Sequence, residues 1–139
     1  MLKNIPSIIS PDLMYTLMSM GHGEEIVFAD ADFPAGSYSK KIIRMDGVRI
    51  EALLEAVLPF FPLDPFVKDP AVTMDCSEWG PEPESYERYR RVIRKVDVRF
   101  NDFEFMKRFD FYERAAQASA VVVTSEPDGN VILKKGPVM

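Results

Sequence analysis

Two short segments of this chain, residues 26–29 (IVFA) and 120–123 (AVVV), are apolar at every position. A strand that is exposed on one face alternates apolar and polar residues, whereas an unbroken apolar run is typical of a strand buried on both faces. Such a strand needs cover on each side of its sheet, and stretches with helical periodicity occur before and between these two segments. The pattern therefore predicts an α/β fold in which helices flank a mixed β-sheet.

Six segments have the composition of short strands. They are residues 24–30, 42–45, 71–77, 97–102, 120–125 and 131–136. Asp46-Gly47 is a turn signal that ends the second strand, and residues 128–130 (DGN) lie between the last two. Because such turns commonly join antiparallel neighbours, we expect a hairpin at DGN.

Four segments have helical patterns: residues 10–21, 49–61 and 82–96, and a fourth that begins near Tyr112. In the first, Ser10 is a favourable N-cap, Pro11 suits the first helical position and Gly21 ends the pattern. Residues 62–70 contain three prolines and are expected to be irregular. No repeat or long linker divides the chain, so residues 1–139 are predicted to form one domain.

The chain carries a net charge of −5, and its basic cluster at residues 88–95 directly follows acidic residues. This balance argues against nucleic acid and against a membrane surface as partners, because both need a basic face that acids do not offset. No run of 18 apolar residues and no signal-peptide core is present, so the expected location is the cytoplasm. Cys76, the one cysteine, excludes an internal disulfide, and we expect a small buried thiol in a strand.

The one histidine, His22, lies between two glycines directly before the strand at 24–30, and Asp30 and Asp32 lie at the other end of that strand. At about 3.3 Å per residue, the two ends are about 20 Å apart. His22 and Asp30 can therefore meet only if a loop folds back or if two subunits adjoin. The alternatives are that all three are ordinary turn and capping residues, or that one imidazole and two carboxylates bind a metal ion.

Two further clusters could carry chemistry. In residues 107–115 (KRFDFYERA), bases precede aromatic residues and an acid–base pair, although the aromatic residues could equally pack in the core. The turn at 128–130 is the other cluster. Trp79 lies among acids and prolines, where an ordinary packing role is favoured over a stacking platform for a ligand ring.

Four motifs together resemble the L-fucose mutarotase / D-ribose pyranase (RbsD/FucU) family, in particular its fucose mutarotase branch. They are MGHG (20–23), DADFP (30–34), RFDFYERA (108–115) and GNVILKKG (129–136). The resemblance extends nearly from end to end and is weakest at residues 66–105. It implies an RbsD-like fold and an isomerase that interconverts the α and β anomers of a reducing monosaccharide, L-fucose or a related neutral sugar, without a metal or other cofactor.

The same resemblance implies roles for single residues. Opening a sugar ring needs one group that removes the anomeric hydroxyl proton and another that protonates the ring oxygen. By their places in the motifs, His22 takes the proton-donor role and Asp30 binds sugar hydroxyls. Arg108 and Asn130 make further substrate contacts, and Tyr112 hydrogen-bonds within the site or supports it.

Two positions differ from the fucose mutarotase branch. Asp32 stands where these relatives have a histidine, and Asp128 stands where they have a tyrosine. As residues of a substrate site, both would make its lining acidic, which repels uronic acids and favours neutral polyols. The two changes leave the physiological sugar open.

Members of the resembled family form ring-shaped homo-oligomers, with a decamer as the candidate size here. Together with the separation of His22 from Asp30, this leads us to expect sites near subunit interfaces. The competing interpretation is a sugar-binding or regulatory protein that has lost catalysis, and the third is a metal-dependent hydrolase.

Overall fold

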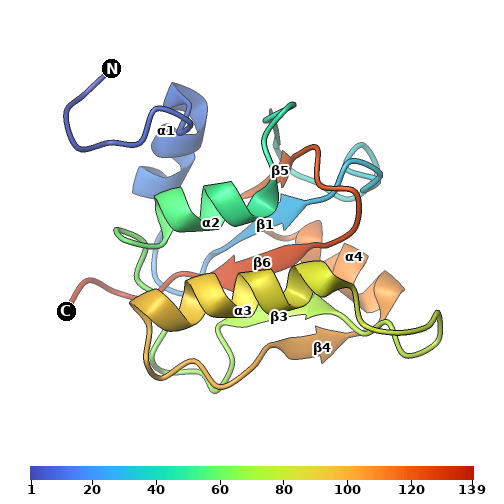
Figure 1. Ribbon diagram of the computed structural model, residues 1–139. Helices are drawn as coiled ribbons and strands as arrows, with labels where there is room; N and C mark the ends of the chain where they lie inside the picture. The colour runs from blue at the N-terminus through green and yellow to red at the C-terminus, as the bar shows by residue number, and fades with distance from the viewer.

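Six strands form one mixed sheet in the computed structural model, which describes residues 1–139 (Figure 1). The strands are β1 (Glu25–Ala29), β2 (Ile42–Arg44), β3 (Ala71–Met74), β4 (Glu104–Met106), β5 (Ala120–Val123) and β6 (Val131–Lys134). Their order in the sheet is β2-β5-β1-β6-β3-β4. The predicted α/β fold with a mixed sheet is confirmed.

The two unbroken apolar segments, in β1 and β5, lie side by side in the middle of the sheet. Val27 pairs with Val121 in the parallel ladder between them, and with Ile132 in the antiparallel ladder between β1 and β6. All three side chains are fully buried. Burial on both faces explains the lack of alternation that the sequence shows.

Helices cover both faces of the sheet. They are α1 (Pro11–Ser19), α2 (Ile50–Val57), α3 (Glu84–Val96) and α4 (Arg108–Ala115). Ile26 and Phe28 belong to the core cluster that α1, α2 and α3 complete, whereas Val27 and Ala29 belong to the cluster that α4 completes. Figure 1 shows the first three helices on one side of the sheet and α4 on the other. No helix is long and apolar enough to cross a membrane.

Local signals located the first helix correctly. Ser10 Oγ accepts a hydrogen bond from the Leu13 backbone N–H at 3.1 Å, and Pro11 is the first helical residue. The fourth helix begins earlier than expected, at Arg108 rather than near Tyr112. The whole RFDFYERA motif is therefore helical, which places Arg108 and Tyr112 one turn apart on the same face.

Two predictions about strands and turns are wrong. Residues 97–102 are not a strand, because the Asp97 carboxylate accepts hydrogen bonds from the backbone N–H and the guanidinium of Arg99, both at 3.0 Å, and closes a local turn. The strand lies further on, at Glu104–Met106, parallel to β3. DGN is not a hairpin turn, because β1 separates β5 from β6, and the connection crosses beyond the end of β1 (Figure 1).

Candidate functional site

A pocket of about 400 Å³ opens where β1 ends, beside the connection from β5 to β6. Ligands of open α/β sheets commonly bind at such strand ends. Six of the candidate site residues that the sequence suggests line this pocket: Asp30, Asp32, Arg108, Tyr112, Asp128 and Asn130. Three segments that are far apart in the chain therefore converge on one cavity.

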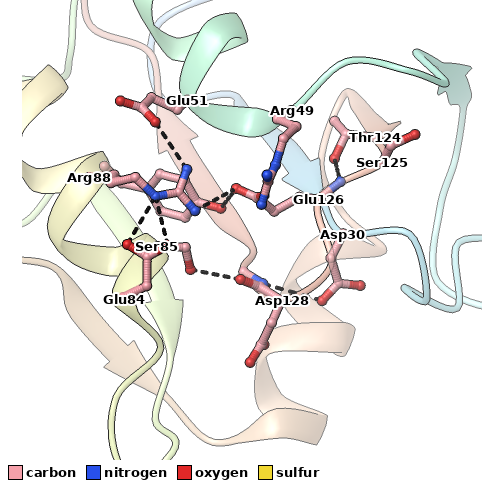
Figure 2. Close-up of polar contacts among 12 residues, drawn as sticks. Asp30, Arg49, Glu51, Glu84, Ser85, Arg88, Thr124, Ser125, Glu126 and Asp128 are labelled. Atoms are coloured by element: carbon pink, nitrogen blue, oxygen red, sulfur yellow. Dashed lines mark hydrogen bonds and ion pairs between the residues drawn. The ribbon is translucent and has the colours of Figure 1, made fainter.

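Asp30 and Asn130 form the centre of the polar lining. The Asp30 backbone N–H donates to Asn130 Oδ1 at 2.8 Å, and Asn130 Nδ2 donates to Asp30 Oδ2 at 3.1 Å. This double contact is possible because β1 and β6 are neighbours in the sheet. The backbone N–H groups of Asp32 and Gly129 also point at the Asp30 carboxylate, at 3.1 and 3.5 Å, and Figure 2 shows the second of these contacts. The Asp30 carboxylate is therefore held in one orientation.

Helix α4 supplies the opposite wall through Arg108 and Tyr112. Arg108 Nε donates to Tyr112 Oη at 2.9 Å, and the guanidinium lies over the Tyr112 ring, 5.4 Å from its centroid. The ring itself packs edge-on against Phe33 at 5.2 Å. Tyr112 is thus both a core residue and a pocket residue, and its hydroxyl and the Arg108 guanidinium lie together in the pocket wall.

Three carboxylates and one guanidinium set the charge of the pocket. Burial raises the pKa of the Asp30 carboxyl above its usual value, and the neighbouring Asp128 carboxylate adds to the increase, although hydrogen bonds from Asn130 and two backbone N–H groups act against it. With Asp32 also in the lining, carboxylates outnumber Arg108. Such a lining accepts hydrogen bonds from hydroxyl groups and disfavours anionic ligands.

Two lining residues depart from what the sequence led us to expect. Cys76 is half-buried and lies beyond the end of β3, in the pocket wall, rather than being a buried strand residue. Trp79 is 57% exposed and also lines the pocket, so the favoured packing role is wrong. The signal for both was present in the Asp, Ser, Pro and Gly residues of segment 75–83, which predict a turn-rich loop beside the strand end.

His22 does not line this pocket. It lies at the other end of β1, where its Nε2 is 3.1 Å from Asp64 Oδ1 and its ring packs against Phe66 at 5.6 Å between centroids. No loop folds back to join His22 to Asp30 within one chain, and no group of three His, Cys, Asp or Glu side chains is placed to hold a metal ion. The structure thus rules out the single-chain metal set of His22, Asp30 and Asp32.

Asp64 is the functional candidate that sequence reasoning missed. Its side chain is 4% exposed, while that of His22 is 47% exposed. Burial raises the pKa of Asp64, but hydrogen bonds from the Phe66 N–H and from His22 outweigh burial and leave the pKa below its usual value. Asp64 stands in the proline-rich segment 62–70, where nothing in the spacing points toward residue 22.

The chain is thus a small α/β protein with a pocket at the end of its central strand. The carboxylates and the amide of this pocket suit a small ligand that carries several hydroxyl groups. Residues 3–138 match the model of the RbsD / FucU transport protein family, and the chain belongs to this family. The membership confirms the resemblance that the four motifs carry.

Relatives and solved structures agree with this membership. The chain is 46% identical to an L-fucose mutarotase of Haemophilus influenzae over 98% of this chain and 96% of that protein, and 45% identical to a fucose mutarotase of Mus musculus over 97% and 94%. A crystal structure of the fucose mutarotase from Streptococcus pneumoniae in complex with L-fucose superposes with a TM-score of 0.91 at 43% identity, covering 99% of this chain and all of that one. RbsD of Bacillus subtilis, at 18% identity and a TM-score of 0.74, shares the fold.

Proposed function

We propose that this protein is a sugar mutarotase that interconverts the α and β anomers of L-fucose or a closely related neutral sugar. The observation that carries the proposal is the pocket that gathers Asp30, Asn130 and Arg108 at the end of β1. Near full-length similarity to proteins named L-fucose mutarotase, and to a fucose mutarotase solved with L-fucose, supports the same activity.

The chemistry is an opening and reclosing of the hemiacetal ring. A base removes the proton of the anomeric hydroxyl, the C1–O1 bond becomes a carbonyl, and the bond from C1 to the ring oxygen breaks as an acid protonates that oxygen. Rotation about the C1–C2 bond followed by the reverse steps gives the other anomer. In this proposal Asp30 and Asn130 hold sugar hydroxyls, Arg108 and Tyr112 orient the ring, and His22 transfers a proton.

The proton-transfer group comes from a neighbouring subunit in this proposal. Since His22 and Asp30 flank β1 at opposite ends, about 20 Å apart along the strand, a single chain cannot place both on one sugar. His22 is half-exposed and its Nε2 contacts buried Asp64, so when Nε2–H donates to Asp64 the other nitrogen is free to exchange protons. A ring-shaped homo-oligomer would bring this His22–Asp64 pair to the next subunit's pocket.

Saturation-transfer NMR on the anomeric signals of L-fucose, D-ribose, galactose and rhamnose tests the proposed activity. We expect enzyme-dependent exchange that is fastest for L-fucose or a related neutral sugar. Sugar binding without transfer between anomeric signals would contradict the proposal and indicate a binding or regulatory protein. Stoichiometric metal in the purified protein together with absent exchange would indicate a hydrolase instead.

As the pH is lowered, sugar binding is expected to weaken before the pH reaches the usual pKa of an aspartate. The reason is that the raised pKa of Asp30 lets this carboxylate protonate early, and a protonated carboxyl loses acceptor capacity for sugar hydroxyls. Trp79 is the only tryptophan and lines the pocket, so a fluorescence titration with L-fucose across pH measures the binding directly.

Asp128→Asn is the matched variant for this measurement. It removes the negative charge that helps to raise the pKa of Asp30, so the midpoint of the binding loss should move to lower pH. Because the pKa of Asp30 is raised in the folded protein, protonation of Asp30 stabilises the folded state as the pH falls. This titration therefore cannot itself unfold the protein in the same pH range. An unchanged midpoint in Asp128→Asn would show that another group controls the acid limb.

A further inference from the structure

A fully buried carboxylate, Glu126, lies in the connection between β5 and β6, and the proposed chemistry does not use it. Its side chain is 0% exposed. Glu126 Oε2 accepts a hydrogen bond from Arg49 Nε at 2.7 Å, Oε1 accepts one from the Tyr89 hydroxyl, and Arg88 Nη2 lies 3.7 Å from Oε1 (Figure 2). A buried charge persists only where such partners surround it, so this site is built around the carboxylate.

The backbone of Glu126 is hydrogen-bonded to the turn at the edge of the pocket. Its carbonyl oxygen accepts a hydrogen bond from the Ala31 N–H at 2.9 Å, and its own N–H donates to Thr124 Oγ1 at 3.1 Å. Ala31 lies between Asp30 and Asp32. The residue that carries the buried charge is therefore bonded to the turn that holds two pocket carboxylates.

Tyr89, the partner of Glu126 on helix α3, packs against the segment that carries the pocket residues Asp128 and Asn130. Gly129 has φ +149°, and a Cβ at this position would collide with the Tyr89 hydroxyl and Ser85 Oγ. Ser85 Oγ donates to the Asp128 carbonyl at 2.7 Å, a contact that Figure 2 shows. Segment 128–130 therefore packs against Tyr89, whose hydroxyl donates to Glu126.

We propose that Glu126 is a positioning residue for the sugar pocket. Its carboxylate fixes Tyr89 and Arg49, Tyr89 fixes the backbone at Gly129, and that backbone places the Asn130 amide on Asp30. The expected effect on catalysis rests on the proposed mutarotase activity, whereas the expected effect on the position of the Asn130 amide concerns the sugar-free protein.

Tyr89 is suited to this role because its hydroxyl keeps its proton. Burial raises the pKa of its hydroxyl, and the hydrogen bond to the Glu126 carboxylate raises it further, so the hydroxyl remains a donor. Arg88 has further carboxylate partners, because it donates to Glu51 at 3.0 Å and to Glu84 at 3.1 Å. The contact between Tyr89 and Glu126 can therefore be weakened without releasing the rest of the network.

Three variants test the proposal: Glu126→Gln, Tyr89→Phe, and Ile93→Val as the control. Glu126→Gln keeps the size of the side chain and removes its charge, and Tyr89→Phe removes one hydroxyl. Ile93→Val trims a fully buried apolar side chain on the same helix that takes no part in the hydrogen bonds and ion pairs of the network. The first readout is the side-chain amide resonance pair of Asn130 in the sugar-free protein, and the second is the exchange rate of L-fucose anomers as a function of sugar concentration.

We expect Glu126→Gln and Tyr89→Phe to shift or broaden the Asn130 amide signals and to raise the KM for L-fucose about tenfold or more with a smaller change in kcat. Ile93→Val should change neither, even if it lowers Tm.

If Glu126→Gln fails to fold, the loss of a single hydroxyl in Tyr89→Phe still decides the question. If wild-type protein shows no exchange, the proposed function fails while the Asn130 signals still test the positioning role. Asn130 signals that stay unchanged in folded Tyr89→Phe, or move equally in Ile93→Val, would overturn the inference.

Discussion

Replacing His22 with alanine is expected to lower the enzyme-dependent exchange of L-fucose anomers by about 10²- to 10⁴-fold, the range that general acid–base assistance supplies. The pocket at the other end of β1 keeps all of its lining residues in this variant. L-fucose should therefore still bind, and the loss should appear in the rate at saturating sugar. Saturation-transfer NMR measures the rate, and Trp79 fluorescence measures the binding.

Asp64→Asn is the matched control for His22→Ala. The depressed pKa of Asp64 keeps this carboxylate ionised near neutrality, where it lies 3.1 Å from His22 Nε2 and can hold the imidazole in one orientation. We expect Asp64→Asn to retain His22 and to lose less activity than His22→Ala. Exchange that is as fast in His22→Ala as in the wild-type protein would remove His22 from the mechanism.

Mixed oligomers of two inactive variants should recover activity. In a head-to-tail ring, each site would take Asp30 from one subunit and His22 from the next, so random mixing of His22→Ala and Asp30→Asn chains leaves about one site in four intact. We expect about one quarter of the wild-type exchange rate from co-expressed chains. The separate variants, measured at the same total concentration, provide the baseline.

Light scattering of the same samples completes this experiment. A shared site requires an oligomer, so wild-type protein that is monomeric in solution while catalysing exchange would contradict the shared site. Mixed oligomers that form but remain at the baseline would contradict it as well, because they would show that His22 and Asp30 do not complement each other across subunits.

Local sequence signals predicted the elements that depend on local physics. The cap at Ser10 and Pro11, the unbroken apolar runs of β1 and β5, and the irregular path of residues 62–70 all follow from side chains a few positions apart. One error arose where a distant partner decided the outcome, because DGN resembles a hairpin but β1 occupies the place beside β5. The other arose from a local contact that competes with a strand, because Asp97 accepts hydrogen bonds from Arg99 and closes a turn.

Some residues of the site could be predicted from the sequence and others could not. Asp30, Arg108 and Asn130 stand in motifs that point to a sugar site, and the structure brings them together with Tyr112. The loop that adds Trp79 could be recognised as a turn, but its direction depends on how β3 leaves the sheet. Asp64 and Glu126 gave no signal, because a carboxylate is recognised as buried only when its partners are known.

By itself, the sequence determined the two-faced burial of the central strands, the separation of His22 from Asp30 along one of them, and the acidic character of the pocket. Each follows from covalent spacing and side-chain type, which do not change on folding. Only the tertiary structure decided that β1 lies between β5 and β6, that Asp64 contacts His22, and that Tyr89 donates to Glu126. The two side-chain contacts, His22 with Asp64 and Tyr89 with Glu126, join residues that are 42 and 37 positions apart in the chain. Such contacts form only when the whole sheet and its helices pack together.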